Sequence, residues 1–235
     1  MTRRLLGAGA VLLALGLGIL PAAGEDKKDG PTDDKKPAAA TTAAGDEKWV
    51  SLFNGKDLTG WKTHPKDKAK WEVKEGLLVG TGPVGHLFSE RGDYKNFRYR
   101  VEAKINDHGN SGQYFRAQFG PGFPKGYEAQ INSTHRDPIR TGSLYPSFGP
   151  SREDRDKLLI KEQLVKPDTW FTQEVDAVGP HIVIKVNGKT TVDYTDPKNT
   201  YKEGHFALQG HDPGTVVKFR KIEVKELPPG NAAEK

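Results

Sequence analysis

The chain has 235 residues, of which 34% are hydrophobic and 29% charged, with 27 glycines, 16 prolines and no cysteine. The lack of cysteine excludes disulfides, thiolate zinc sites, iron–sulfur clusters, cysteine nucleophiles and lipid-modified N-terminal cysteines. The formal net charge of +5 is small and dispersed along the chain, which argues against a nucleic-acid-binding protein. A polar, turn-rich globular protein remains.

The first 24 residues have the pattern of a secretory signal peptide. Arg3 and Arg4 form a positive end, residues 5–20 are uncharged and apolar, and small residues precede Glu25. The apolar run is shorter than the roughly 20 residues that a spanning helix needs, so we expect no stable membrane insertion after removal of the signal. The sequence therefore predicts a periplasmic or secreted protein.

The composition divides the rest of the chain into three parts. Residues 25–48 alternate short acidic and basic blocks and contain no aromatic or large aliphatic side chain. Such a segment cannot bury enough apolar surface to offset the entropy of ordering, so it is predicted to be a disordered charged linker. Residues 49–227 are long and apolar enough for one domain with a substantial core, and residues 228–235 are expected to be a disordered tail.

Within the domain, apolar residues recur with a period of two, which indicates half-buried β-strands. In Phe97–Ile105, every second residue is apolar and the residues between them are charged. Residues 181–194 are typical of a hairpin that turns at Asn187-Gly188. Between Phe219 and Ile222 the apolar phase changes, which predicts a β-bulge near residues 220–221. Further strands are expected at residues 49–53, 70–74, 77–80, 86–89, 111–119, 127–131, 171–177 and 205–209.

Many short strands joined by glycine, proline, asparagine and aspartate turns indicate an all-β protein, a β-sandwich of two antiparallel sheets. The one helix expected lies within residues 152–163, where the high density of charge favours a position at the surface. No internal repeat of fixed period is present.

Three of the predicted strands, at residues 111–119, 127–131 and 205–209, carry unusual polar side chains on one face. If these strands are neighbours, the polar faces combine into a floor of groups that hydrogen-bond and stack sugars. An ordinary solvated sheet face is the alternative. The residues of this predicted floor are Arg116, Glu128, Gln130, Gln209 and His211, with Tyr114 or Tyr145 at its rim.

Several familiar catalytic motifs are absent from the sequence. There is no phosphate-binding glycine loop with lysine, no HExxH, no serine nucleophile elbow and no EF-hand loop. The spacing of His211 and Asp212 does not support a metal site, so no metal ligand is assigned, and a divalent metal is left open. The predicted floor has one carboxylate, Glu128, where ordinary glycoside hydrolysis uses two. His86 and His135 are expected to be loop or surface residues.

A series of short motifs resembles, in the same order, those of the 3-keto-disaccharide hydrolase domain family, a former domain of unknown function. The resemblance runs through nearly the whole domain, and the joint order of the motifs is its specific part. It implies a concanavalin A-like jelly roll with the site on the concave sheet. It also implies a substrate oxidised to a ketone at C3 by a separate sugar 3-dehydrogenase. The matching segments are residues 52–61, 71–76, 110–116, 126–131, 141–145, 170, 186–188, 204–211 and 219–222.

The implied substrate suggests a mechanism with a single base. A ketone at C3 acidifies the C2 proton, so its removal gives an enediolate that expels the C1 leaving group; hydration follows, and direct attack of water is the alternative. On this hypothesis Glu128 or His211 is the base and proton shuttle. Arg116, or a metal in its place, stabilises the enolate oxygen. The side chains expected to bind the substrate are those of Asn110, Gln130, Tyr145 and Gln209.

Two other functions fit the same fold. A noncatalytic carbohydrate-binding module is the main alternative, since a fold by itself does not determine a function. A laminarinase-like glycosidase is a weaker one, because its usual E-x-D-x-x-E strand is absent.

Overall fold

A computed structural model of the chain describes residues 48–229. The predicted signal peptide, the linker up to residue 47 and residues 230–235 of the predicted tail lie outside the described residues. Within residues 48–229, no helix is long and apolar enough to cross a membrane.

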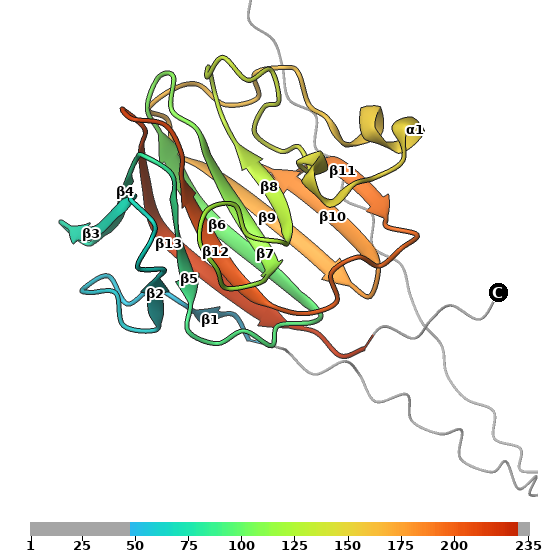
Figure 1. Ribbon diagram of the computed structural model, residues 1–235, viewed down its shortest axis with the longest axis horizontal. Helices are drawn as coiled ribbons and strands as arrows, with labels where there is room; N and C mark the ends of the chain where they lie inside the picture. Colours follow the sequence, from blue (N-terminus) through green and yellow to red (C-terminus); the bar gives the residue numbers. More distant parts are fainter. Residues whose placement is uncertain (1–47, 230–235) are drawn as a thin grey trace, which may run out of the picture. The chain divides into compact units, whose positions relative to one another are not determined.

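Two antiparallel sheets make up the fold (Figure 1). The strands of the larger sheet are β1 (Val50–Ser51), β3 (Lys70–Lys74), β4 (Leu77–Thr81), β6 (Phe97–Ile105), β9 (Phe171–Val178), β10 (His181–Val186), β11 (Lys189–Thr195) and β13 (Val216–Glu226). Those of the smaller sheet are β2 (Trp61–Thr63), β5 (Gly85–Ser89), β7 (Ser111–Ala117), β8 (Tyr127–Ile131) and β12 (His205–Gly210). The larger sheet has the order β11-β10-β9-β6-β13-β4-β3, with β1 paired to β13, and the smaller has the order β2-β5-β12-β7-β8.

The core lies between the sheets and is rich in aromatic rings. Phe206 on β12 stacks on Tyr99 of β6 at a centroid distance of 4.0 Å and on Tyr94 at 4.2 Å. Along β6 the predicted apolar positions are all buried, as a strand with one face on the core requires. The other face of β12, β7 and β8 is therefore free to carry polar groups.

Most of the predicted strands are confirmed, and so is the bulge in the last one. In the pairing of β13 with β6, the register shifts between Phe219 and Lys221, which keeps Ile222 and Val224 buried. The hairpin at Asn187-Gly188 is confirmed as β10 and β11. The short strand β2 was not predicted; its three residues are too few for a periodic pattern.

The helix predicted within residues 152–163 is shorter than expected. It consists of α1 (Arg152–Arg155) followed by a 3-10 turn, η2 (Asp156–Leu158), and a second 3-10 turn, η1 (Pro146–Phe148), precedes it. The Ser151 hydroxyl caps α1 by accepting a hydrogen bond from the backbone N–H of Asp154 at 3.1 Å. At the end of η2 the chain returns to the domain, where the side chain of Leu158 is buried in the core.

A bulge in β7 places Arg116 away from the predicted floor. His205 of β12 pairs with Ala117 and Ala207 pairs with Tyr114, so Phe115 and Arg116 oppose one residue. Arg116 adopts φ +50° there, and its side chain, 1% exposed, donates to backbone carbonyls. The prediction that Arg116 lies with Glu128 on the polar floor is wrong, because the bulge changes the phase of the strand. The acceptors are the carbonyl oxygens of Lys95 at 2.9 Å, Gly179 at 2.7 Å and Tyr201 at 3.1 Å.

Replacing Arg116 with alanine is expected to lower the free energy of unfolding by about 2–3 kcal/mol, because the carbonyls that it binds lose their donor. Urea unfolding of the purified variant measures this loss. The matched control is Arg98→Ala, since Arg98 is an exposed partner of Asp176 at 3.4 Å and is expected to cost less than about 1 kcal/mol. Equal losses in the two variants would contradict the structural role of Arg116.

Candidate functional site

A cavity of about 510 Å³ lies over β7, β8 and β12, on the face of the smaller sheet turned away from the core. Six of the seven predicted site residues line it, and Arg116 does not. The structure therefore brings together the side chains that the polar-face pattern singled out on separate strands. The predicted residues that line the cavity are Asn110, Glu128, Gln130, Tyr145, Gln209 and His211.

Glu128 lies on the floor of this cavity with 4% of its surface exposed. Its side chain crosses the neighbouring strand at Gly112, where a Cβ atom would stand 2.2 Å from Oε1 of Glu128. The glycine thus leaves room for the carboxylate. Burial raises the pKa of Glu128 to about 8; the Tyr114 hydroxyl opposes this rise and the negative charge of Asp137 adds to it. The result is a carboxylate that exchanges its proton near neutral pH.

Amide side chains surround this carboxylate. Nε2 of Gln209 donates to the Tyr114 hydroxyl at 3.2 Å, so the phenol keeps its own proton for another acceptor. Oδ1 of Asn110 is buried and has no hydrogen-bond partner among the described residues. A buried carbonyl without a donor is unfavourable, and the hydroxyl of a ligand would satisfy it.

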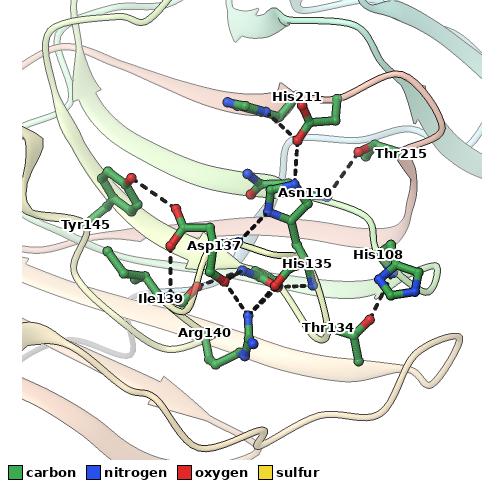
Figure 2. A network of polar contacts seen from close by, with 12 residues as sticks. His108, Asn110, Thr134, His135, Asp137, Ile139, Arg140, Tyr145, His211 and Thr215 are labelled. Atoms are coloured by element: carbon green, nitrogen blue, oxygen red, sulfur yellow. Dashed lines mark hydrogen bonds and ion pairs between the residues drawn. The ribbon is translucent and has the colours of Figure 1, made fainter.

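Two histidines share one carboxylate at the edge of the cavity (Figure 2). Oδ2 of Asp212 lies 2.7 Å from Nε2 of His135 and 3.0 Å from Nδ1 of His211. Nδ1 of His135 accepts from the backbone N–H of Asp137 at 3.1 Å, so in the neutral ring Nε2 carries the proton and faces Asp212. Nε2 of His211 is the ring nitrogen left for a ligand.

The Asp212 carboxylate between the two imidazoles is ionised at neutral pH. Although desolvation raises its pKa, the hydrogen bond and charge of His211, with the charge of His135, hold the pKa of Asp212 below its usual value. A carboxylate that stays ionised can accept hydrogen bonds from both imidazoles.

The loop that follows β8 carries His135, Asp137 and Tyr145 and is fastened from within (Figure 2). Oδ1 of Asp137 accepts from the backbone N–H of Ile139 at 2.9 Å, and Oδ2 accepts from the Tyr145 hydroxyl at 3.1 Å. The Arg140 guanidinium donates to the carbonyl of His135 at 2.7 Å and also to that of Asp137. These bonds hold the loop side chains in place before any ligand binds.

Sequence reasoning missed several of the residues at the site. His135 lies in the loop after β8, as expected, but it is buried and lines the cavity, which was not predicted. The prediction that His86 is a loop or surface residue is wrong. His86 is fully buried in β5 opposite Gln209, and burial, then the charge of His211, lowers its pKa to about 3. Alternation along β5, where His86 and Phe88 share a face, was the available signal for His86. The other unpredicted lining residues are Phe123, Pro124, Arg136, Asp137 and Ser147.

Within the described residues 48–229, no group of three or more histidine, aspartate or glutamate side chains is arranged to hold a metal ion.

A comparison with protein families shows to which family this domain belongs. Residues 48–225 match the family described as the 3-keto-alpha-glucoside-1,2-lyase-like domain. The chain belongs to this family. The sequence is similar to that of a 3-keto-disaccharide hydrolase of Bacteroides thetaiotaomicron, with 29% identity over 82 aligned residues. The match covers 30% of this chain and only 28% of that protein's length.

Solved structures share the fold of this 3-keto-alpha-glucoside-1,2-lyase-like domain. A candidate glycosyl hydrolase from Parabacteroides distasonis is similar with a TM-score of 0.58 at 22% identity, over 77% of this chain and 94% of that one. The carbohydrate-binding module CBM66 from Bacillus subtilis is similar with a TM-score of 0.51 at 16% identity, over 71% and 96%. At such identities the likeness concerns the fold, and the predicted jelly-roll sandwich of two antiparallel sheets is confirmed.

The buried state of Glu128 predicts a pH-dependent stability. Its pKa is about 8 in the folded protein against 4.5 for the free side chain, so the stability that the bound proton contributes is complete below pH 4.5 and is lost as the pH rises through 8. Glu128→Gln carries no such charge. In urea unfolding, the free energy of unfolding of this variant relative to that of the wild type is expected to rise between pH 5 and pH 9, by up to about 4 kcal/mol.

The matched control for this measurement is Glu72→Gln, because Glu72 is exposed and pairs only with Lys74 in an ion pair at 2.6 Å. The difference in free energy of unfolding between this control and the wild type is expected to stay constant between pH 5 and pH 9. A constant difference for Glu128→Gln as well would show that Glu128 titrates like an exposed carboxylate.

Proposed function

We propose that the protein cleaves the glycosidic bond of sugars already oxidised to a ketone at C3, with Glu128 as the base that removes the C2 proton. The observation that carries this proposal is a buried carboxylate with a pKa of about 8 on the floor of a cavity, in a domain of this family. A general base works best when its pKa lies near the working pH, and the 3-ketone makes the C2 proton acidic enough for a carboxylate.

The proposed reaction is an elimination followed by hydration. Glu128 takes the C2 proton, and the electrons of the C2–H bond form an enediolate with the C3 ketone. Collapse of the enediolate breaks the C1–O bond, and His211 gives a proton to the departing oxygen. Asp212 stabilises the imidazolium form of His211 that this step requires. Water then adds across the C1–C2 double bond: its oxygen bonds to C1 as His211 takes up its proton, and Glu128 returns a proton to C2. The product is the free 3-keto sugar, so the sum is a hydrolysis.

Tyr114 takes the role that the sequence assigned to Arg116. Its hydroxyl accepts from Gln209, and its own proton, which the Glu128 carboxylate holds in the free protein, turns to the enolate oxygen once Glu128 has taken up the C2 proton. Burial, with the charge of Glu128, raises the pKa of Tyr114 well above its usual value. A phenol that stays neutral is a donor that strengthens as negative charge develops on the substrate. Oδ1 of Asn110 accepts from a sugar hydroxyl in this arrangement.

The proposal includes a place for the protein in the cell and in a reaction sequence. The signal-like pattern of residues 1–24 supports export to the periplasm or beyond. An oxidation of the glycoside at C3, by a sugar 3-dehydrogenase, must precede the step proposed for Glu128.

The second candidate is a carbohydrate-binding module without catalysis. The amides of Asn110, Gln130 and Gln209 favour it, since they bind hydroxyls without any change of protonation. Turnover separates the two candidates, because a binding module releases no product.

Purified protein incubated with 3-keto-trehalose, 3-keto-sucrose or a 3-keto-glucoside is expected to release the leaving alcohol, measured by chromatography with and without a chelator. In the proposed mechanism kcat/KM rises with pH through the pKa of Glu128, about 8, as this base loses its proton. Glu128→Gln is expected to lower kcat about a thousandfold, and the control Glu72→Gln to leave it unchanged. Binding without release, in all three cases, would favour the carbohydrate-binding module.

The position of the base is tested at Gly112. In Gly112→Ala the new methyl group displaces the Glu128 carboxylate, whose flexible side chain moves at little cost in stability. We expect kcat to fall at least tenfold while KM and the unfolding midpoint change little, since misplacement of a base by about 1 Å costs much of its effect. Full activity of this variant would contradict the placement of Glu128 as the base.

A further inference from the structure

The connection between β7 and β8 forms a ridge over the outer face of the smaller sheet (Figure 1). We define the ridge as residues 118–126. Its base is closed by a hydrogen bond from the backbone N–H of Gln118 to the carbonyl of Lys125, at 2.8 Å. Two of its residues, Phe123 and Pro124, line the cavity. One wall of the proposed site is therefore made by this ridge.

A buried carboxylate ties the ridge to the sheet. Oδ1 of Asp67 accepts from the backbone N–H of Gly122 at 3.0 Å, and Oδ2 accepts from the backbone N–H of His86 at 2.9 Å. The Asp67 side chain is 3% exposed, so both bonds are shielded from water. The position of Phe123 follows from an anchored backbone.

Despite this anchoring, Phe123 is 60% exposed. Within residues 48–229 the other exposed large hydrophobic residues are Val50 and Phe119, and neither lines the cavity. Exposed apolar surface beside a polar cavity is typical of a ligand-binding surface. An aromatic ring in such a place stacks on the flat apolar face of another ring.

The ring of Phe123 lies beside the proposed acid. Its centroid is 5.4 Å from that of His211, with 40° between the two planes. In the proposed function, His211 protonates the departing oxygen, so the group that carries this oxygen extends next to Phe123. The cavity of about 510 Å³ is within the range of about 300–1,000 Å³ that holds ligands of two or more rings.

We propose that Phe123 is the platform of a leaving-group subsite, which takes a ring with an apolar face. This inference rests on the proposed function. The shared chemistry is a ring with an apolar face on the departing oxygen, and this ring comes from either a second sugar or an aryl group. The subsite makes the protein selective for the leaving group independently of the oxidised sugar.

The test compares three 3-keto-α-glucosides that differ in their leaving groups: methyl, phenyl and glucosyl. In Phe123→Ala, the ratio of kcat/KM for the phenyl or glucosyl compound to that for the methyl compound is expected to fall about three- to tenfold. Phe119→Ala is the matched control, because Phe119 is an exposed phenylalanine of the same ridge outside the cavity. It is expected to keep the wild-type ratios.

Each outcome bears on the proposal. A lower ratio for both ring compounds assigns the subsite to rings in general, and a lower ratio for one of them assigns it to that source. Unchanged ratios in Phe123→Ala, or an equal fall in Phe119→Ala, overturn it. If the wild type cleaves none of the compounds, the proposed function fails, and calorimetric binding decides the subsite: phenyl must bind more tightly than methyl to the wild type and lose this advantage in Phe123→Ala.

Discussion

Burial of polar side chains on the outer face of the five-stranded sheet is the constraint on which the site depends. The ridge of residues 118–126 and the loop after β8 stand over strands whose outward side chains would otherwise be solvated. Under this cover the Glu128 carboxylate keeps its proton to a pKa of about 8, and the Tyr114 phenol stays neutral. The same side chains on an open sheet would keep the usual pKa values of a carboxylic acid and a phenol. The strands therefore fix the positions of these side chains, and the loops that cover them shift their pKa values.

The two loops differ in how they are held. The loop after β8 is fastened within itself, through Arg140, Asp137 and Tyr145, whereas the ridge depends on Asp67 from a distant part of the chain. The first supplies ionisable groups to the cavity and the second supplies a phenyl ring. The charged and the apolar side chains of the cavity wall are thus carried by two separate loops.

Local patterns were enough to predict most of the fold. Alternation in Phe97–Ile105, the turn at Asn187-Gly188 and the phase change after Phe219 each depend on neighbouring residues, and each is confirmed. Arg116 was misplaced because its bulge arises from pairing with β12, some ninety residues further along the chain. His135 and Asp137 escaped prediction because an irregular loop has no period from which the direction of a side chain can be read.

Family resemblance and strand faces together indicated Glu128 and the amides, but neither revealed what surrounds them. Two imidazoles meet one carboxylate at Asp212 because β12 ends beside the loop after β8, which is a matter of topology. The burial of His86 likewise depends on Phe88, Tyr114 and Phe123 packing around it from three segments.

The anchoring of the ridge divides the walls of the cavity between two parts of the chain. Glu128 is carried by β8, whereas the backbone next to Phe123 is bound by Asp67, which lies between β2 and β3. A substitution at Asp67 would therefore act on the wall that holds Phe123, while the strand that carries Glu128 keeps its pairing with β7.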